Sequence, residues 1–161
     1  MEIIKITQTN DALTRLVALF RVELRSYKGI TSKPNIEAAR EEMEEYLAAG
    51  FPVFAAIIDG EYAGYVVCRV DSEVVWVESI FVKEEYRRHG VATALHSKAE
   101  EIAASYGEDT VYNYVHPNNH RMIEFLRNRG YTVLNLIEIR KTYEGEKLTQ
   151  KVCVGEHEFD Y

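Results

Sequence analysis

VVWVESIFVKEEYRRHGVATALHSKAEEIAASY, residues 74–106, contains three consecutive patterns. Its first nine residues are mostly β-branched or aromatic, which predicts a strand over residues 74–82. A charged turn follows. Apolar residues then recur every three to four positions, which predicts a helix over 91–106 that ends at Gly107. The apolar face of this helix is expected to contain Val91, Leu95, Ala99, Ile102 and Tyr106.

The turn between this strand and this helix reads RRHGVA, residues 87–92. Gly90 lets the main chain approach a bulky group because glycine has no Cβ atom. The first N–H groups of a helix lack intrahelical acceptors, and together with the helix dipole they favour an anion. With Arg87 and Arg88 beside them, these amides are expected to hold a phosphate or pyrophosphate. The alternative is an ordinary strand-to-helix turn with solvated arginines.

The rest of the chain predicts further strands and helices around this unit. A helix is expected after Asn10, a favoured N-cap that an amphipathic pattern follows. Two further helices are expected to begin at Pro34 or Asn35 and at Asn118-Asn119. Residues 110–115 follow a helix and are expected to pair in parallel with residues 74–82. The other expected strands are residues 2–6, 51–58, 62–71, 131–141 and 148–154.

Length and composition limit the class of protein. At 161 residues, 47% of them hydrophobic, the chain is expected to fold as a single domain over residues 1–161. No apolar run approaches the ~20 residues that cross a bilayer, and the N-terminus lacks a signal-peptide pattern, so no membrane partner is expected. Cys68 and Cys153 lie in apolar runs, which indicates buried thiols and a cytoplasmic location.

Charge and histidine spacing argue against two further classes. A net charge of −7 argues against a nucleic-acid partner, which requires a broad basic face. It suits a cationic partner, although many soluble proteins are acidic merely for solubility. The 5 histidines lack ligand spacing with cysteines or carboxylates, so no metal site is expected.

Two motifs resemble the GNAT N-acetyltransferase superfamily. Arg87-x-x-Gly90-x-Ala92 is similar to its R/Q-x-x-G-x-G/A signature, and residues 119–131, NHRMIEFLRNRGY, are similar to its N-x-x-A-I-x-L-Y-x-x-x-G-F segment. The resemblance covers residues 53 to 140, approximately. It implies an α/β (α+β) fold: a mixed, mostly antiparallel central sheet of about 6–7 strands, flanked by about 4 helices, with one parallel strand pair around an acetyl-CoA site.

The resemblance also implies which residues bind acetyl-CoA, the co-substrate. A bulge at Ser79 would free main-chain amides for the thioester carbonyl and the pantetheine arm. The amide of Ile80 or Phe81 would donate to the oxyanion, and Val82 would complete this segment. Asn119 matches an asparagine near the pantetheine, although asparagine here is also an ordinary helix N-cap. The pyrophosphate would lie against the turn, whose residues are Arg87, Arg88, His89, Gly90, Val91 and Ala92.

Three side chains are candidates for the chemistry of acetyl transfer. Glu78 lies in an otherwise apolar strand, where a carboxylate is costly without a partner or a task. It resembles a glutamate that acts as base, directly or through water, in several polyamine and aminoglycoside acetyltransferases; the alternative is a solvent-facing glutamate. Many relatives place a tyrosine acid where this chain has Leu126. Tyr114 and His116 alternate to one face, where they could replace that acid or contact the acceptor, or could simply pack as aromatic residues.

The acceptor and the assembly stay open. No nucleophile motif is present, so direct attack by a primary amine in a ternary complex is expected. The acidic balance and Glu78 favour a small cationic amine, and the α-amine or lysine of a peptide is the alternative. A non-catalytic module that binds or senses CoA is another. A homodimer is also open, because residues 148–154 could close the sheet of their own subunit or of a neighbour.

Overall fold

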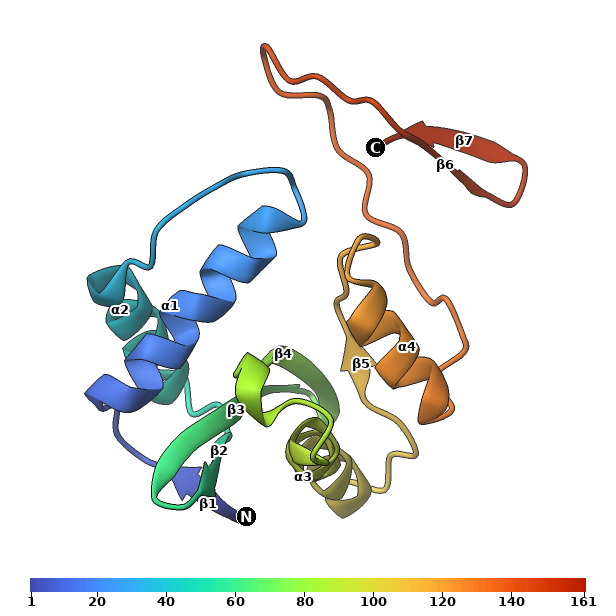
Figure 1. Ribbon diagram of the computed structural model, residues 1–161. Coiled ribbons are helices and arrows are strands. Elements are labelled where there is room, and N and C mark those ends of the chain that lie inside the picture. The colour runs from blue at the N-terminus through green and yellow to red at the C-terminus, as the bar shows by residue number, and fades with distance from the viewer. The chain divides into compact units, whose positions relative to one another are not determined.

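The computed structural model describes residues 1–161, which form two compact units, Met1–Phe125 and Leu126–Tyr161. The larger unit contains a five-stranded sheet in the order β1-β2-β3-β4-β5 (Figure 1). Its strands are antiparallel except for the last pair, β4 and β5, which is parallel. The strands are β1 (Glu2–Ile6), β2 (Val53–Ile58), β3 (Glu61–Asp71), β4 (Val74–Val82) and β5 (Tyr112–Asn113). This confirms the predicted mixed sheet with one parallel pair.

Four α-helices accompany the sheet, as predicted. They are α1 (Asp11–Ser26), α2 (Ile36–Ala48), α3 (Val91–Ser105) and α4 (His120–Asn128), and the single turn η1 (Glu84–Tyr86) leads from β4 toward α3. Asn10 caps α1 by accepting a hydrogen bond from the Leu13 N–H at 2.9 Å, and Asn35 caps α2 in the same way. None of the helices is long and apolar enough to cross a membrane.

The two faces of the sheet are covered by different helices. Tyr65 and Val67 of β3 belong to one buried cluster with Leu13 and Leu16 of α1 and with Met43 of α2. Alternate residues of β3 point to the opposite face, which packs on α3. Gly64 lies on that second face, where a Cβ atom would lie 2.6 Å from Phe81 O and 3.2 Å from Leu95 Cδ1. The absence of a side chain at Gly64 therefore lets α3 pack closely on the sheet.

After α3 two of the predicted strands are shorter than expected and one is absent. Only Tyr112–Asn113 of residues 110–115 pairs with β4, and residues 131–141 form no regular secondary structure. The last predicted strand begins at Lys151 rather than at residue 148; as β6 (Lys151–Val154) it forms a hairpin with β7 (His157–Asp160), which the sequence did not indicate. The central sheet therefore has fewer strands than predicted. An apolar pattern gives a tendency to form a strand, but a strand exists only where its main chain pairs with a neighbour.

Cys153 and Tyr106 were predicted to be buried, and both predictions are wrong. Cys68 of β3 is buried as expected, whereas Cys153 of the two-stranded sheet β6-β7 is exposed. Tyr106, expected on the buried face of its helix, is the C-cap of α3 and 46% exposed. The ends of helices and the strands of small sheets have fewer neighbours to cover them, so sequence periodicity overestimates their burial.

Candidate active site

Strand β4 contains an extra residue at Glu78. Ser79 pairs with Val67 of β3, but Val77 already pairs with the next β3 residue, Cys68, so Glu78 has no opposite partner. The shift in register expected at Ser79 is therefore present. Such a bulge re-aims side chains, because the strict alternation of faces is interrupted.

The bulge places Glu78 on the sheet face that α1 and α2 cover. On this face Ser79 lies opposite Val67, and beyond the bulge Trp76 lies opposite Arg69. Glu78 Oε2 accepts a hydrogen bond from Arg69 Nε at 3.1 Å, and both side chains are 29% exposed. The strand prediction treated Glu78 as an isolated carboxylate; in the structure Arg69 compensates for part of the cost of its burial.

Aromatic side chains extend from Glu78 toward β5. The Arg69 guanidinium lies 5.1 Å from the Trp76 ring, and Trp76 in turn contacts Tyr112 at 4.7 Å and Tyr114 at 4.8 Å between ring centroids. The Tyr114 ring is nearly parallel to Trp76, at 11°, and it is 62% exposed. Glu78 therefore adjoins an aromatic surface, and such surfaces attract cations.

Tyr114 and His116 do not share one set of neighbours. Strand β5 ends at Asn113, so alternation no longer fixes the two side chains on one face. His116 stacks on Tyr27, at the end of α1, with 5.9 Å between the ring centroids. Its Nδ1 accepts a hydrogen bond from the Asn118 N–H at 3.2 Å, which requires an unprotonated nitrogen. Burial, assisted by the charge of Lys28, lowers the pKa of His116, which favours the same neutral form.

The turn before α3 has the conformation that an anion site needs. Gly90 is the N-cap of α3 in the left-handed region, with φ of 78°, and Arg88 also has a positive φ of 66°. Ala94 is the first residue of α3 whose N–H has an intrahelical acceptor, Gly90 O at 3.0 Å. The N–H groups of Val91 and Ala92 precede it and point out of the helix N-terminus. Arg88 and His89 are exposed beside them.

The edge of β4 near this turn is open on the side of β5. The parallel pairing joins only Trp76 to Tyr112 and Val77 to Asn113. From Glu78 to Val82, β4 has a strand partner only on the β3 side. Its remaining main-chain groups, which include those of Ile80 and Phe81, can therefore pair with an extended ligand that carries amide groups.

Glu23 of α1 binds Arg87, Arg121 and Tyr27, and no sequence pattern predicted this role. One of its oxygens accepts from Arg87 Nη2 at 2.7 Å, and the other accepts from Arg121 Nη2 at 2.8 Å and from the Tyr27 hydroxyl at 2.7 Å. Burial, together with the Glu23 hydrogen bond, raises the pKa of Tyr27. Arg87 also donates from Nε to Val82 O at 2.9 Å. The Arg87 side chain thus ties the end of β4 to α1.

Asn119 caps the N-terminus of α4, which is the alternative to a contact with the pantetheine. Its Oδ1 accepts from the Met122 N–H at 3.1 Å, in the first turn of α4. Its own N–H donates to His116 O at 2.8 Å. Asn118, next to it, donates from Nδ2 to Tyr27 O at 2.9 Å. These contacts hold the loop between β5 and α4 against the end of α1. No group of three or more histidine, cysteine or carboxylate side chains is placed to hold a metal ion.

Comparison with known proteins gives consistent matches. The sequence model described as "Acetyltransferase (GNAT) family" matches residues 16–131. An uncharacterized N-acetyltransferase of Methanocaldococcus jannaschii is 32% identical over 85 residues, covering 48% of this chain and 38% of that protein. An N-alpha-acetyltransferase of Sulfurisphaera tokodaii is 29% identical over 114 residues, covering 60% of this chain and 64% of that protein. The chain thus spans less than two thirds of the length of either relative.

Solved structures share the fold. The structure of AAC(6')-Iy in complex with a bisubstrate analogue, CoA-S-monomethyl-acetylneamine, has a TM-score of 0.61 and 22% identity, covering 89% of this chain and 100% of that chain. A GNAT-family acetyltransferase of Staphylococcus aureus has a TM-score of 0.60 and 19% identity, covering 80% and 84%. At these identities the likeness is one of fold.

Proposed function

Because this chain belongs to the acetyltransferase (GNAT) family, we propose that it transfers an acetyl group from acetyl-CoA to a primary amine by direct attack. The observation that carries the proposal is the combination, on one strand, of a bulge and an open edge. The bulge turns the Glu78 carboxylate toward the sheet face that α1 and α2 cover. Beyond the bulge, β4 has an open edge, and the chain then continues through η1 to the N-terminus of α3 at Gly90.

The residues of this region fit acetyl-CoA. The N–H groups at the start of α3 would hold its pyrophosphate, with Arg88 and His89 adding positive charge from the exposed side of the turn. The open edge of β4 would pair with the amides of its pantetheine arm, and the N–H of Ile80 or Phe81 would donate to the thioester carbonyl oxygen. The cofactor supplies the activated acetyl carbon and a thiolate leaving group, which needs little acid assistance at a pKa near 8.5.

Glu78 is the proposed base. An alkylamine with a pKa of ~10.4 is almost wholly protonated at neutral pH and cannot attack until a proton is removed. Glu78 would take that proton directly or through a water molecule, and Arg69 would keep its carboxylate oriented. Tyr114 would contact the acceptor from the aromatic surface, and His116 is a second candidate for contact with it.

A small cationic amine is the proposed acceptor. The carboxylate of Glu78 and the ring faces of Trp76 and Tyr114 both attract an ammonium group, so the acceptor would be concentrated there before it loses its proton. A peptide α-amine is the second candidate, because one relative carries the name N-alpha-acetyltransferase.

Thiol release from acetyl-CoA over a panel of amines tests the proposal. The panel pairs polyamines and aminoglycosides with short peptides that have free α-amines. Release with the small cationic amines supports the proposal, and release with peptides alone would transfer it to the second candidate. Cofactor binding without release for any amine would indicate a non-catalytic CoA-binding module.

A further inference from the structure

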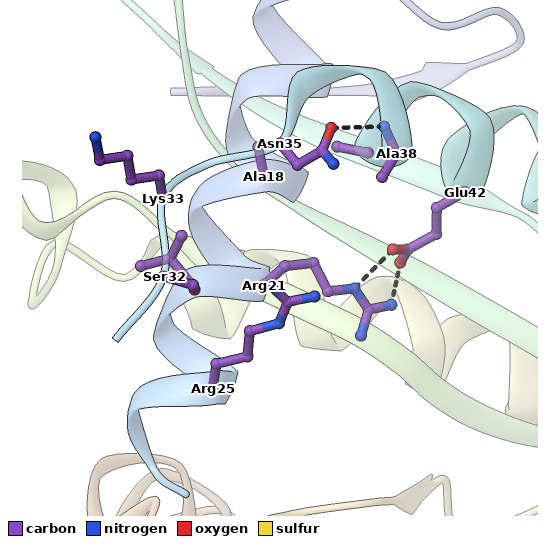
Figure 2. A pocket seen from close by; sticks show the side chains of 10 residues that line it. Ala18, Arg21, Arg25, Ser32, Lys33, Asn35, Ala38 and Glu42 are labelled. Atoms are coloured by element: carbon purple, nitrogen blue, oxygen red, sulfur yellow. Dashed lines mark hydrogen bonds and ion pairs between the residues drawn. The ribbon is translucent and has the colours of Figure 1, made fainter. Parts of the chain in front are cut away.

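A separate pocket of about 240 Å³ lies between α1 and α2. It is formed by the last two turns of α1, the connecting loop and the first two turns of α2. Figure 2 shows the Arg21 guanidinium directed toward Glu42 and the Arg25 side chain extending along α1 toward Arg21, with Ser32 beside Arg25. Its volume is several times the ~30 Å³ that one water molecule occupies in the liquid, so it suits a small ligand or one end of a larger ligand.

The charges around this pocket are predominantly positive. Arg21 donates to both oxygens of Glu42, from Nε at 2.6 Å and from Nη2, so these two charges compensate each other. Arg25 and Lys33 form no ion pair in the chain, and both are exposed at the pocket. In Figure 2 the Lys33 side chain extends away from the arginines, whereas the Arg25 side chain extends toward Arg21. A local excess of positive charge in a chain of net charge −7 favours an anion at this place.

A hydroxyl group at the pocket lacks a hydrogen-bond partner. The Ser32 Oγ atom is buried, and no donor or acceptor of the protein lies within hydrogen-bond distance of it. Buried polar groups are rarely left unpaired, because their desolvation is then uncompensated. A hydroxyl donates readily to a carboxylate or phosphate oxygen. The hydroxyl and the Arg25 guanidinium therefore offer two kinds of donor to the same ligand.

We propose that this pocket binds the anionic group, a carboxylate or a phosphate, of a small molecule. Arg25 would pair with the anion, Ser32 would donate a hydrogen bond to it, and Lys33 would add long-range attraction from the rim. The Arg21–Glu42 pair would form the opposite wall, where its charges are already satisfied. This site is separate from the turn at Gly90, and its existence does not depend on the proposed acetyl transfer.

Tyr46 extends the Arg21–Glu42 pair of the pocket wall. The Tyr46 hydroxyl donates to Glu42 Oε1 at 3.0 Å, on the pocket wall. Burial raises the pKa of Tyr46, and the charges of Glu42 and, more weakly, Glu78 raise it further. The anion has two possible sources: it belongs to the amine acceptor itself, or it belongs to a second small molecule.

Titration with inorganic phosphate, followed by amide NMR, tests the proposal. Saturating CoA is present throughout, so that a phosphate site at Gly90 is already occupied. We expect saturable shifts of the Ser32, Ala38 and Ala39 amides, and at least about tenfold weaker binding in Arg25→Gln and in Ser32→Ala, because each variant loses one donor. Lys33→Gln is expected to have a smaller effect.

The control variant is Arg15→Gln, which removes an exposed arginine of α1 that does not line the pocket. It should bind phosphate as the original chain does. Absence of saturable shifts at these amides, or equal binding by Arg25→Gln and the original chain, would overturn the proposal. As a folding control, the core amide signals of each variant should superimpose on those of the unmodified protein.

Kinetic measurements then distinguish the two sources of the anion. If the anion belongs to the acceptor, phosphate inhibits competitively with amines that carry a carboxylate, and Arg25→Gln raises KM for those amines but not for their uncharged analogues. If it belongs to a second molecule, phosphate alters turnover without competing with the amine. The NMR result stands in either case, including the case in which no acetyl transfer occurs.

Discussion

Strand β4, Val74–Val82, and residues 131–141 have a similar amino-acid composition but different structures. Both are rich in β-branched and aliphatic residues, and each contains one glutamate, Glu78 or Glu138. β4 pairs with β3 along its length and with β5 at two residues. Residues 131–141 form no strand and join no sheet, and Val133 and Leu134 are 86% and 71% exposed. Propensity therefore sets a tendency, and available partners decide whether a strand forms.

The largest expected effect compares two leucines, one packed on the central sheet and one in the unpaired stretch. Leu95→Ala on α3 removes a side chain that is 0% exposed and contacts the sheet near Gly64. We expect it to lower the free energy of unfolding by ~2–5 kcal/mol. Leu134→Ala should change it by less than about 0.5 kcal/mol. Urea titration measures both, and equal losses would contradict the different burial of the two side chains.

The next prediction compares two glycines with positive φ and with nothing within 4 Å of a built Cβ, Gly90 and Gly145. Gly90→Glu places bulk and negative charge where the pyrophosphate is proposed to bind, so CoA affinity should fall more than about a hundredfold, or ~3 kcal/mol. Gly145→Glu should leave affinity unchanged, although it suffers similar backbone strain. Calorimetric titration with CoA measures the affinity of both variants. An unaltered affinity for Gly90→Glu would show that the pyrophosphate does not bind at Gly90.

Replacing the two glutamates of the compared stretches should separate chemistry from structure. Glu78→Gln is expected to lower kcat about a hundredfold at neutral pH, within the usual contribution of a general base. The deficit should shrink as pH rises, because the acceptor amine then loses its proton without assistance. Glu138→Gln serves as the control with no change. If the profile of kcat against pH keeps its shape in Glu78→Gln, Glu78 is not the base.

The smallest effect concerns ion pairs. Glu23→Gln weakens contacts with Arg87 and Arg121, and the Glu23 and Arg87 side chains are only 26% and 23% exposed. We expect a loss of about 1–2 kcal/mol in the free energy of unfolding. Asp160→Asn in β7 breaks a pair with Lys151 whose side chains are 59% and 58% exposed, and should destabilise the protein less than Glu23→Gln does, because solvent screens an exposed pair. Denaturant unfolding of both variants shows whether the two pairs differ.

Local patterns predicted the part of the fold that local interactions determine. The β4–turn–α3 unit and the helix cap at Asn10 follow from neighbouring residues. The helix between the two strands predicted the parallel pair β4–β5, and the family resemblance added the shift in register at Ser79. Residues 131–141 were predicted wrongly, because no sequence pattern reveals whether a strand has a partner.

The missed parts of the site depend on distant residues. Glu23 meets Arg87 and Arg121 across 64 and 98 residues of sequence, and nothing near Glu23 distinguishes it from other helix glutamates. Arg69 pairs with Glu78 across a hairpin, and only the bulge brings the two together on one face. Charged residues can be predicted as exposed or paired, but their partners require the three-dimensional structure.

A crystal structure with bound CoA tests the central claim most directly. We expect the pyrophosphate to lie within hydrogen-bond distance of the N–H groups of Gly90, Val91 and Ala92. We also expect the pantetheine arm to lie along the edge of β4 beyond Val77, with its sulfur on the side of Glu78. A coenzyme bound away from the N-terminus of α3, or an arm that leaves this edge of β4 uncovered, would contradict the account.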